Sequence, residues 1–469
     1  MKIIIAGAGA VGTHLAQLLS RDNQDIVVID ESQDKTDALT DSGNYDLMTV
    51  NAPTTSISAM KGAGVQHADL FIAVTPYETT NITCCMLAHA LGAKKTVARV
   101  DNAEYVQPQY KDMFQQMGID SLIYPEVLAA HEILEGVRFS WVRQYWELHD
   151  GLLIMLGIKL RESATILEIP LRKLCPPDAP YHIVVIKRGD DTIVPGGNDV
   201  LKLGDIAYFV TTRKQISMLR ELVGKEKYPE VKDVMIMGGG QMSVQVARMK
   251  PDWMSMRIVE LSEERCRQLN DLLENEDIVI IHGDGRDTVT LVEEGIKSCE
   301  AFAALTSETE TNILSCLAAK RLGVRKTVAL VENMDYVDMA EKLDIGTIIN
   351  KKAIAASHIF QMLLDADVTS IKSLTIANAD VAEFIALEDS LITQKPIREL
   401  CLPQGVALGG LIRGNVGIPI NGSTLIQPGD SVVVFAVDGI VKKMDRYFRK
   451  PEGNVFSKLM EKLGSSSKE

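Results

Sequence analysis

A glycine-rich turn near the N-terminus has the residue types and spacing of a phosphate-binding site. Gly7, Gly9 and Gly12 follow an apolar run and open a helix-like segment. The first glycine permits a tight turn, the second lets the backbone approach a pyrophosphate, and the third brings the helix close to the sheet. The next apolar run ends at Asp30, which is placed to accept a hydrogen bond from a ribose hydroxyl. The stretch therefore predicts an adenine-nucleotide site rather than a turn without a ligand.

Five short apolar runs, separated by helical patterns, must position this turn. They are residues 3–6, 26–29, 47–50, 70–74 and 96–100. Strands that alternate with helices in this way form a parallel, doubly wound α/β sheet, and ligands bind beyond the carboxyl ends of its strands. The candidate contacts of this first site are therefore the turn and the strand ends, namely Gly7, Gly9, Ala10, Val11, Gly12, Asp30, Asn51, Thr75 and Arg99.

The chain repeats itself at an offset of 231 residues. Gly7 to Gly12 returns as Gly238-Gly239-Gly240-Gln241-Met242-Ser243, and residues 92–106 match 323–337 at nine of fifteen positions. One constant offset over such a span indicates a tandem duplication. The candidate contacts of the second site are Gly238, Gly240, Gln241, Met242, Glu260 and Thr306.

The two sites are not expected to be equivalent. Ser243 replaces the third glycine and should crowd the contact between helix and strand slightly without abolishing the fold. Arg99 has Leu330 as its counterpart, so it either favours a more highly charged nucleotide in the first site or forms a surface or intersubunit ion pair. Acids at both ribose positions, Asp30 and Glu260, favour NAD or adenosine nucleotides over NADP, whose 2′-phosphate they would repel.

A smaller, β-rich module follows each copy and recurs as well. Residues 170–175 correspond to 396–401, and the Gly204-Asp205 turn corresponds to Gly429-Asp430. Arg188 and Arg413 also recur, and we interpret them as turn anchors or interface residues. We therefore expect four domains and a tail, with boundaries at 1–138, 139–225, 231–367, 368–450 and 451–469.

An apolar-striped helix within residues 120–137 follows the last strand of the first large module. Such a stripe needs a surface to cover it. Two interpretations stay open: the helix crosses over and packs on a partner, or it simply links two modules.

The composition limits the function classes. A net charge of −14 argues against nucleic-acid binding, because neutralising phosphates requires a basic surface. No apolar run approaches the roughly 20 residues that span a bilayer, and the first strand begins at the N-terminus, so we expect neither a membrane helix nor a signal peptide. The seven cysteines and eight histidines lack metal-ligand spacing. We expect reduced thiols and no metal site.

The layout resembles the cytoplasmic regulatory subunits of Trk-type potassium uptake systems, the TrkA family, with tandem RCK (KTN) domains. The resemblance covers about residues 1–448 and is carried by both glycine turns with their acids, by Thr75 with Asn81 and Thr306 with Asn312, and by the two small modules. The family's Gly-Asp signature after the third strand survives as Gly283-Asp284, two further candidate contacts. The first copy has Ala52-Pro53 there, where Asn51 stands in.

This resemblance implies a regulator without catalytic residues. Family members bind NAD(H) or ATP/ADP, assemble as homo-oligomers (dimers or tetramer rings) and gate a TrkH-type potassium-transporting membrane subunit. They are cytoplasmic and peripheral on the inner face of the plasma membrane.

Two rival functions belong to other classes. A duplicated NAD-dependent oxidoreductase would need an acid or base near the nicotinamide, but no His, Lys or Tyr group recurs in both small modules. His131 and His358 lie on similar helices and are interpreted as packing residues. The third possibility is a binding protein whose small modules sense another ligand, although their Gly-Asp turns are equally well explained as β-turns.

Overall fold

Short apolar strands, buried on both faces, form the centre of the first large module, as a parallel sheet covered by helices requires. The computed structural model describes residues 1–20, 24–41, 46–149, 151–228, 230–274, 276–363, 368–374, 379–437 and 440–450. The tail predicted at 451–469 lies outside these residues.

The first large module is a six-stranded parallel sheet in the order β3-β2-β1-β4-β5-β6. Its strands are β1 (Lys2–Ala6), β2 (Asp25–Asp30), β3 (Met48–Asn51), β4 (Leu70–Ala73), β5 (Thr96–Arg99) and β6 (Ser121–Ile123). Its helices are α1 (Ala10–Ser20), α2 (Gln33–Asp41), α3 (Ile57–Gly62), α4 (Glu78–Leu91), α5 (Lys111–Gln116) and α6 (Pro125–Arg138).

The predicted doubly wound fold is confirmed, but the prediction of five strands was wrong. The sixth strand, β6, pairs with β5 through Val97–Ser121, Ala98–Leu122 and Arg99–Ile123. It is three residues long, too short for its apolar pattern to stand out in the sequence.

The second large module repeats this sheet in the order β14-β13-β12-β15-β16-β17. Its strands are β12 (Asp233–Met237), β13 (Ser255–Glu260), β14 (Ile278–His282), β15 (Ala301–Ala304), β16 (Lys326–Leu330) and β17 (Thr347–Ile349). Its helices are α9 (Gln241–Met249), α10 (Glu263–Leu272), α11 (Thr288–Glu293), α12 (Thr309–Arg321), α13 (Val337–Lys342) and α14 (Lys351–Leu363).

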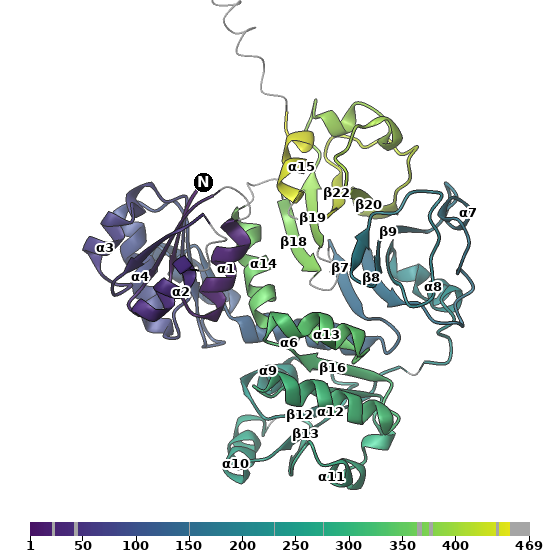
Figure 1. Ribbon diagram of the computed structural model, residues 1–469, viewed down its shortest axis with the longest axis horizontal. Coiled ribbons are helices and arrows are strands. Elements are labelled where there is room, and N and C mark those ends of the chain that lie inside the picture. The colour runs from purple at the N-terminus through teal and green to yellow at the C-terminus, as the bar shows by residue number, and fades with distance from the viewer. Residues whose placement is uncertain are drawn as a thin grey trace, which may run out of the picture. The chain divides into compact units, whose positions relative to one another are not determined.

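The two large modules, residues 1–144 and 227–363, fold into one compact unit (Figure 1). Helix α6 leaves the first module and packs on α9, β16 and β17 of the second, while α14 packs on α1 and α6. The crossover interpretation of 120–137 is thus confirmed, and the surface that covers the helix is the second copy within the same chain.

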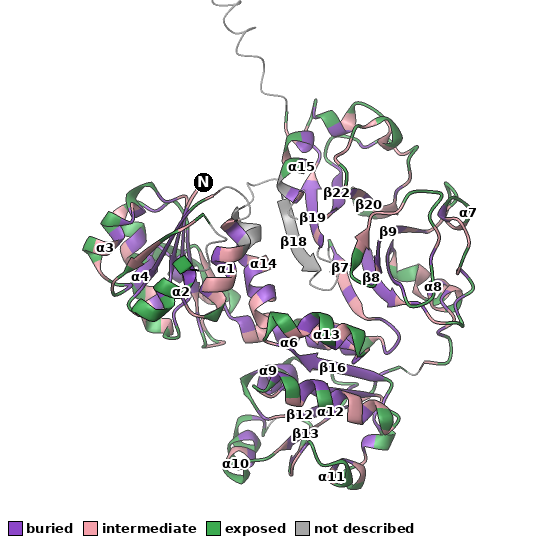
Figure 2. Cartoon of the chain, viewed as in Figure 1, coloured by how far each residue is buried: buried purple, intermediate pink, exposed green. Residues whose placement is uncertain are grey.

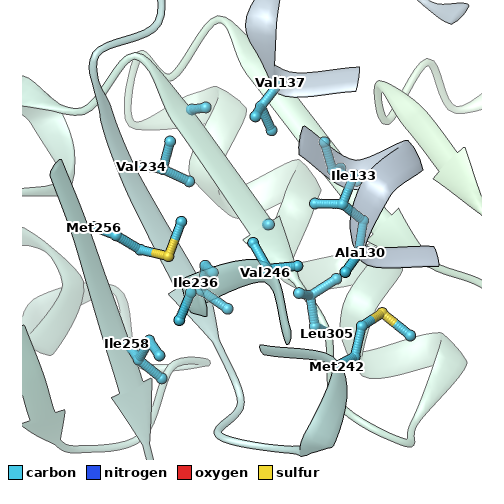
Figure 3. Close-up of a cluster of buried hydrophobic side chains, with 14 of the residues drawn as sticks. Ala130, Ile133, Val137, Val234, Ile236, Met242, Val246, Met256, Ile258 and Leu305 are labelled. Atoms are coloured by element: carbon cyan, nitrogen blue, oxygen red, sulfur yellow. The ribbon is translucent and has the colours of Figure 1, made fainter. Parts of the chain in front are cut away.

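The core of the second module explains why α6 crosses over. Ala130, Ile133 and Val137 of α6 point into a cluster that includes Val246 of α9 and Leu305 at the end of β15 (Figure 3). Ile133 and Val137 are almost fully buried, and each such side chain contributes about 1.5–3 kcal/mol relative to exposure. The first module's last helix therefore completes the second module's core.

The small modules form the other unit, which holds residues 145–226 and the described residues from 368 onward. Its two antiparallel sheets have the orders β10-β9-β11-β8-β7 and β18-β19-β22-β20-β21. The first module has β7 (Gln144–Leu148), β8 (Leu153–Lys159), α7 (Leu171–Leu174), β9 (Tyr181–Arg188), β10 (Asp191–Ile193), β11 (Ile206–Thr211) and α8 (Ile216–Leu222). The second has β18 (Val368–Leu374), β19 (Ala379–Ile385), β20 (Val406–Arg413), β21 (Val416–Pro419), β22 (Ser431–Val437) and α15 (Val441–Phe448).

The small modules share one core, whose strands are largely buried (Figure 2). Gly409 in β20 brings the sheets close together, because a Cβ there would lie 2.9 Å from a methyl group of Val210 and 3.0 Å from one of Val184. The recurring arginines anchor turns, as one interpretation held. Arg188 pairs through two nitrogens with the buried Asp205, and Arg413 does the same with Asp430.

Candidate nucleotide sites

Steric contacts assign a distinct role to each glycine of the first turn. Gly7 adopts φ +112°, and a Cβ there would lie 3.0 Å from the backbone nitrogen of Thr75. A Cβ on Gly12 would lie 1.8 Å from the carbonyl oxygen of Gly7, so α1 can approach β1 only without a side chain at this position. A Cβ on Gly9 would meet nothing within 4 Å. The protein itself thus requires Gly7 and Gly12, whereas Gly9 faces open space that a ligand can use.

The carboxylate of Asp30 holds the turn from the end of β2. Its Oδ2 accepts a hydrogen bond from the Ala8 N–H at 2.6 Å, and its Oδ1 accepts one from the Ser32 N–H at 2.9 Å. The side chain of Asn51, at the end of β3, donates to the carbonyls of Asp30 and Glu31. Asp30 is therefore oriented beside the glycine turn by the protein's own backbone.

The end of β4 is tied to α4 and β5 by a buried threonine–asparagine pair. Asn81 Oδ1 accepts hydrogen bonds from the N–H of Thr75 at 2.8 Å and from its hydroxyl at 2.7 Å. The amide nitrogen of Asn81 donates to the carbonyls of Thr75 and Arg99. Thr75 is thus part of a hydrogen-bond network that holds the ends of β4 and β5 against α4. The signal for Asn81 is present in the sequence, because the second copy repeats the same spacing at Thr306 and Asn312.

Arg99, at the end of β5, forms an ion pair with Asp101 at 2.9 Å. Its Nε is buried and has no hydrogen-bond partner among the described residues. The ion-pair interpretation is therefore realised, and the guanidinium lies at the carboxyl edge of the sheet, where ligands of doubly wound folds bind.

The second turn keeps the same plan with one adaptation. Gly238 has φ +100°, and a Cβ on Gly240 would meet nothing within 4 Å. The fully buried Ser243 donates its hydroxyl to the Gly238 carbonyl at 2.5 Å. The expected crowding is thus accommodated by a hydrogen bond that the glycine of the first copy cannot make.

The acid of the second site repeats the role of Asp30. Glu260 accepts hydrogen bonds from the Gly239 N–H at 2.7 Å and the Ser262 N–H at 2.8 Å. Gln241 is exposed at the start of α9, but the side chain of Met242 is buried in the core (Figure 3). Any contact that Met242 makes with a nucleotide would therefore come from its backbone.

The Gly283-Asp284 segment sits beside β13, because the Gly283 N–H donates to the Glu260 carbonyl at 2.9 Å. Asp284 pairs with both Nε and Nη2 of Arg286. The Arg286 guanidinium lowers the pKa of the Asp284 carboxyl. Arg286 is a charged residue of this edge that the sequence reasoning missed; its counterpart in the first copy is Thr55, so the duplication gave no signal.

Neither His131 nor His358, the two histidines interpreted as packing residues, lies in a glycine turn. His131 lies exposed on α6, and burial lowers the pKa of His358 on α14. Within the described residues, no group of three or more His, Cys, Asp or Glu side chains could hold a metal ion.

In the described part of the chain, no helix is both long enough and apolar enough to cross a bilayer.

Comparison with known proteins identifies the modules. The family described as TrkA-N domain matches residues 3–125 and 234–351, and the family described as TrkA-C domain matches 158–224 and 381–449. Solved structures of the GsuK RCK domain (TM-score 0.59, 18% identity, covering 95% of this chain and 94% of that one) and of the GsuK channel bound to NAD (TM-score 0.58, 17% identity, covering 95% and 78%) share the fold.

Curated relatives agree in length as well as in domain order. The Trk system potassium uptake protein TrkA of Azorhizobium caulinodans is 30% identical over 457 residues, covering 96% of this chain and 99% of that protein. Its namesake in Vibrio alginolyticus is 30% identical over 447 residues, covering 93% and 96%. With both domain types present twice, in the same order and over nearly the full length, the chain belongs to the family of Trk system potassium uptake proteins TrkA.

Proposed function

We propose that the chain is the nucleotide-binding regulatory subunit of a Trk-type potassium uptake system, and that it gates a TrkH-type potassium-transporting membrane subunit. One observation carries the proposal: Gly9 and Gly240 each face open space beside a carboxylate that is already oriented by the turn. A protein that needed these turns only for its own packing would have no use for a glycine at either position.

The proposed ligands are NAD(H) and ATP or ADP. In this proposal Asp30 and Glu260, at the ends of β2 and β13, accept hydrogen bonds from ribose hydroxyls. Helices α1 and α9 begin directly after the turns, and helix N-termini favour phosphate. The GsuK channel, which shares the fold, has been solved with NAD bound. The proposed contacts are the turn, acid and strand-end residues predicted from the sequence, with the backbone of Met242 in place of its side chain.

The proposed mechanism is a shift between conformations. A nucleotide can gate the membrane subunit only if it binds two conformations of the regulator with different affinities. We propose that the chain assembles as a homo-oligomer, a dimer or a tetrameric ring, at the cytoplasmic face of the plasma membrane. The chain's domain content and the potassium uptake relatives support this assignment.

Calorimetric titration with NADH and with ATP tests the proposal. Gly9→Leu and Gly240→Leu should each remove one binding event, because the new side chains occupy the open space beside the turns and displace a phosphate. Asp30→Ala and Glu260→Ala should weaken binding at the same two sites, while Glu31→Ala, at the neighbouring exposed carboxylate, should leave it unchanged.

The same protein preparations distinguish a regulatory subunit from an NAD-dependent oxidoreductase. Potassium flux through the co-reconstituted membrane subunit should change with nucleotide, and no NADH should be consumed. Steady NADH oxidation with a metabolite would identify an oxidoreductase instead. Absence of binding by the wild-type protein would refute nucleotide regulation.

A further inference from the structure

Three charged residues meet where the two large modules contact each other. Lys351, the first residue of α14, lies 3.3 Å from Oε1 of Glu126 on α6 and 3.4 Å from Oε1 of Glu332. Glu126 belongs to the first module, whereas the other two belong to the second. Their side chains are only 14–28% exposed, so solvent screens these contacts weakly. We call this group the ion-pair cluster.

One lysine contacts both carboxylates of the cluster but neutralises only one negative charge. Oε2 of Glu126 is buried and has no hydrogen-bond partner among the described residues. Two carboxylates and one ammonium leave the group with an excess negative charge in a partly buried position. The cluster is therefore sensitive to any further anion that competes for Lys351.

A set of contacts runs from the second glycine turn to the end of β16, two residues before Glu332 of the cluster. Gly238 lies against Thr306, whose N–H and hydroxyl donate to Asn312 Oδ1 at 3.1 and 2.7 Å. The amide of Asn312 donates to the Leu330 carbonyl at 2.9 Å. Glu332 follows two residues later, so the cluster lies at the carboxyl edge of the second sheet, the edge where doubly wound folds bind their ligands.

No counterpart to this arrangement is found among the described residues of the first module. Strands β6 and β17 end two residues before Pro125 and Lys351 respectively, so proline takes the place of the lysine. Arg99 in the first module is already paired with Asp101 of the same module. An anion in the first site therefore meets a cation whose pairing does not involve the other module.

We propose that a phosphorylated ligand at the second site competes with Glu126 for Lys351, so that binding at the second site, and not at the first, loosens the contact between the modules. The inference rests on the proposed nucleotide-binding function. Phosphate oxygens are strong acceptors for an ammonium group. When Lys351 turns toward them, Glu126 is left as a partly buried carboxylate without its cation, which destabilises the packing of α6 on the second module.

Thermodynamic linkage determines whether each substitution raises or lowers the affinity for ADP. If the ligand and Glu126 compete for one lysine, Glu126→Gln frees Lys351 and should tighten ADP binding at the second site at least threefold. Lys351→Met removes the shared cation and should weaken ADP binding at least threefold, and Lys351→Arg should restore most of it. A purely structural contact would predict changes of the same sign for Glu126→Gln and Lys351→Met.

The measurement is ADP titration by calorimetry in the Gly9→Leu background, which leaves the second site alone. Lys352→Met is the matched control, because the Lys352 ammonium donates to the backbone carbonyl of Glu332 and not to Glu126. It should leave the ADP dissociation constant within twofold of its parent. In the Gly240→Leu background, where the first site remains, substitutions at Glu126 and Lys351 should also have no effect beyond twofold.

Hydrogen exchange gives a second readout that does not depend on the sign of the affinity change. ADP should speed exchange of the α6 amides around Ile133 in the wild type and in Gly9→Leu, but not in Gly240→Leu. ADP binding without this pattern, or equal responses of the two sites, overturns the inference and leaves the proposed function standing. No ADP binding in any background overturns both.

Discussion

Substitution of Gly12 separates the glycine that the fold requires from Gly9, the glycine that the proposed ligand would require. A Cβ at Gly12 would lie 1.8 Å from the Gly7 carbonyl oxygen and 3.3 Å from a methyl group of Val74. Because the first obstacle is backbone, α1 must move away from β1. We expect Gly12→Ala to cost about 3 kcal/mol, at the upper end of overpacking substitutions. This lowers the melting temperature of the unit formed by the large modules by about 6–12 °C.

Gly9→Ala is the matched control, since its Cβ would meet nothing within 4 Å. It should leave stability unchanged or raise it by up to about 1 kcal/mol, because alanine restricts the unfolded chain. NADH or ADP binding at the first site should nevertheless weaken, because the methyl group occupies the place of the phosphate. The two alanines thus have opposite effects: one lowers stability and the other lowers affinity.

The second copy indicates that Gly12→Ser should have a stability between those of Gly12→Ala and the wild type. Ser243 occupies the position of Gly12 and donates its hydroxyl to the Gly238 carbonyl. Gly12→Ser should therefore recover about 1 kcal/mol of the loss through the equivalent bond to Gly7. Thermal unfolding followed by circular dichroism should rank the melting temperatures as wild type, Gly12→Ser and Gly12→Ala. Equal melting of Gly12→Ala and wild type, or an equal loss in Gly9→Ala, would refute this reasoning.

Three further predictions concern other parts of the chain. Burial lowers the pKa of His182 to about 4 from 6.5. Because the unfolded state takes up the proton first, the stability of the small-module unit should fall by up to about 3 kcal/mol as the pH drops from 6.5 to 4. Urea unfolding of His182→Leu should show a flatter dependence of stability on pH. Arg188→Met leaves the buried Asp205 without its two-nitrogen partner and should cost about 2–3 kcal/mol in urea unfolding, less than for a fully buried pair because Arg188 is one-third exposed. Asn81→Ala leaves the buried N–H of Thr75 without its acceptor and the Thr75 hydroxyl with only its longer bond to the Tyr77 carbonyl. It should lower the unfolding free energy of the large-module unit by about 2–4 kcal/mol, whereas loss of nucleotide binding without loss of stability would contradict the bracing role.

Local features of the sequence were sufficient for most of the fold. A glycine turn, its flanking apolar runs and the following acid lie within thirty residues and depend on backbone geometry that those residues impose themselves. The constant offset between the large modules then predicted the second sheet, and a separate recurrence, of residues 170–175 at 396–401, predicted the two small modules. The sixth strand was missed because three residues such as Ser121–Ile123 carry too little periodicity.

Side-chain roles at the sites were less predictable. The motif marked Met242 as a candidate contact, but its side chain is in the core that α6 completes. The residue of the first copy that corresponds to Arg286 is not charged, so the duplication did not single Arg286 out. Its ion pair with Asp284 forms only in the folded turn. A motif fixes where the backbone meets a ligand, whereas neighbouring elements decide which side chains remain available.

The sequence by itself determined the module order, the two glycine turns and the acids that lie beside them, because each rests on short-range geometry. Only the tertiary structure decided that α6 completes the core of the other module and that Glu126 meets Lys351 across 225 residues of chain. The physical reason is that an apolar stripe specifies that a surface must cover it, not which surface. The choice depends on shape and charge complementarity between segments that are distant in sequence.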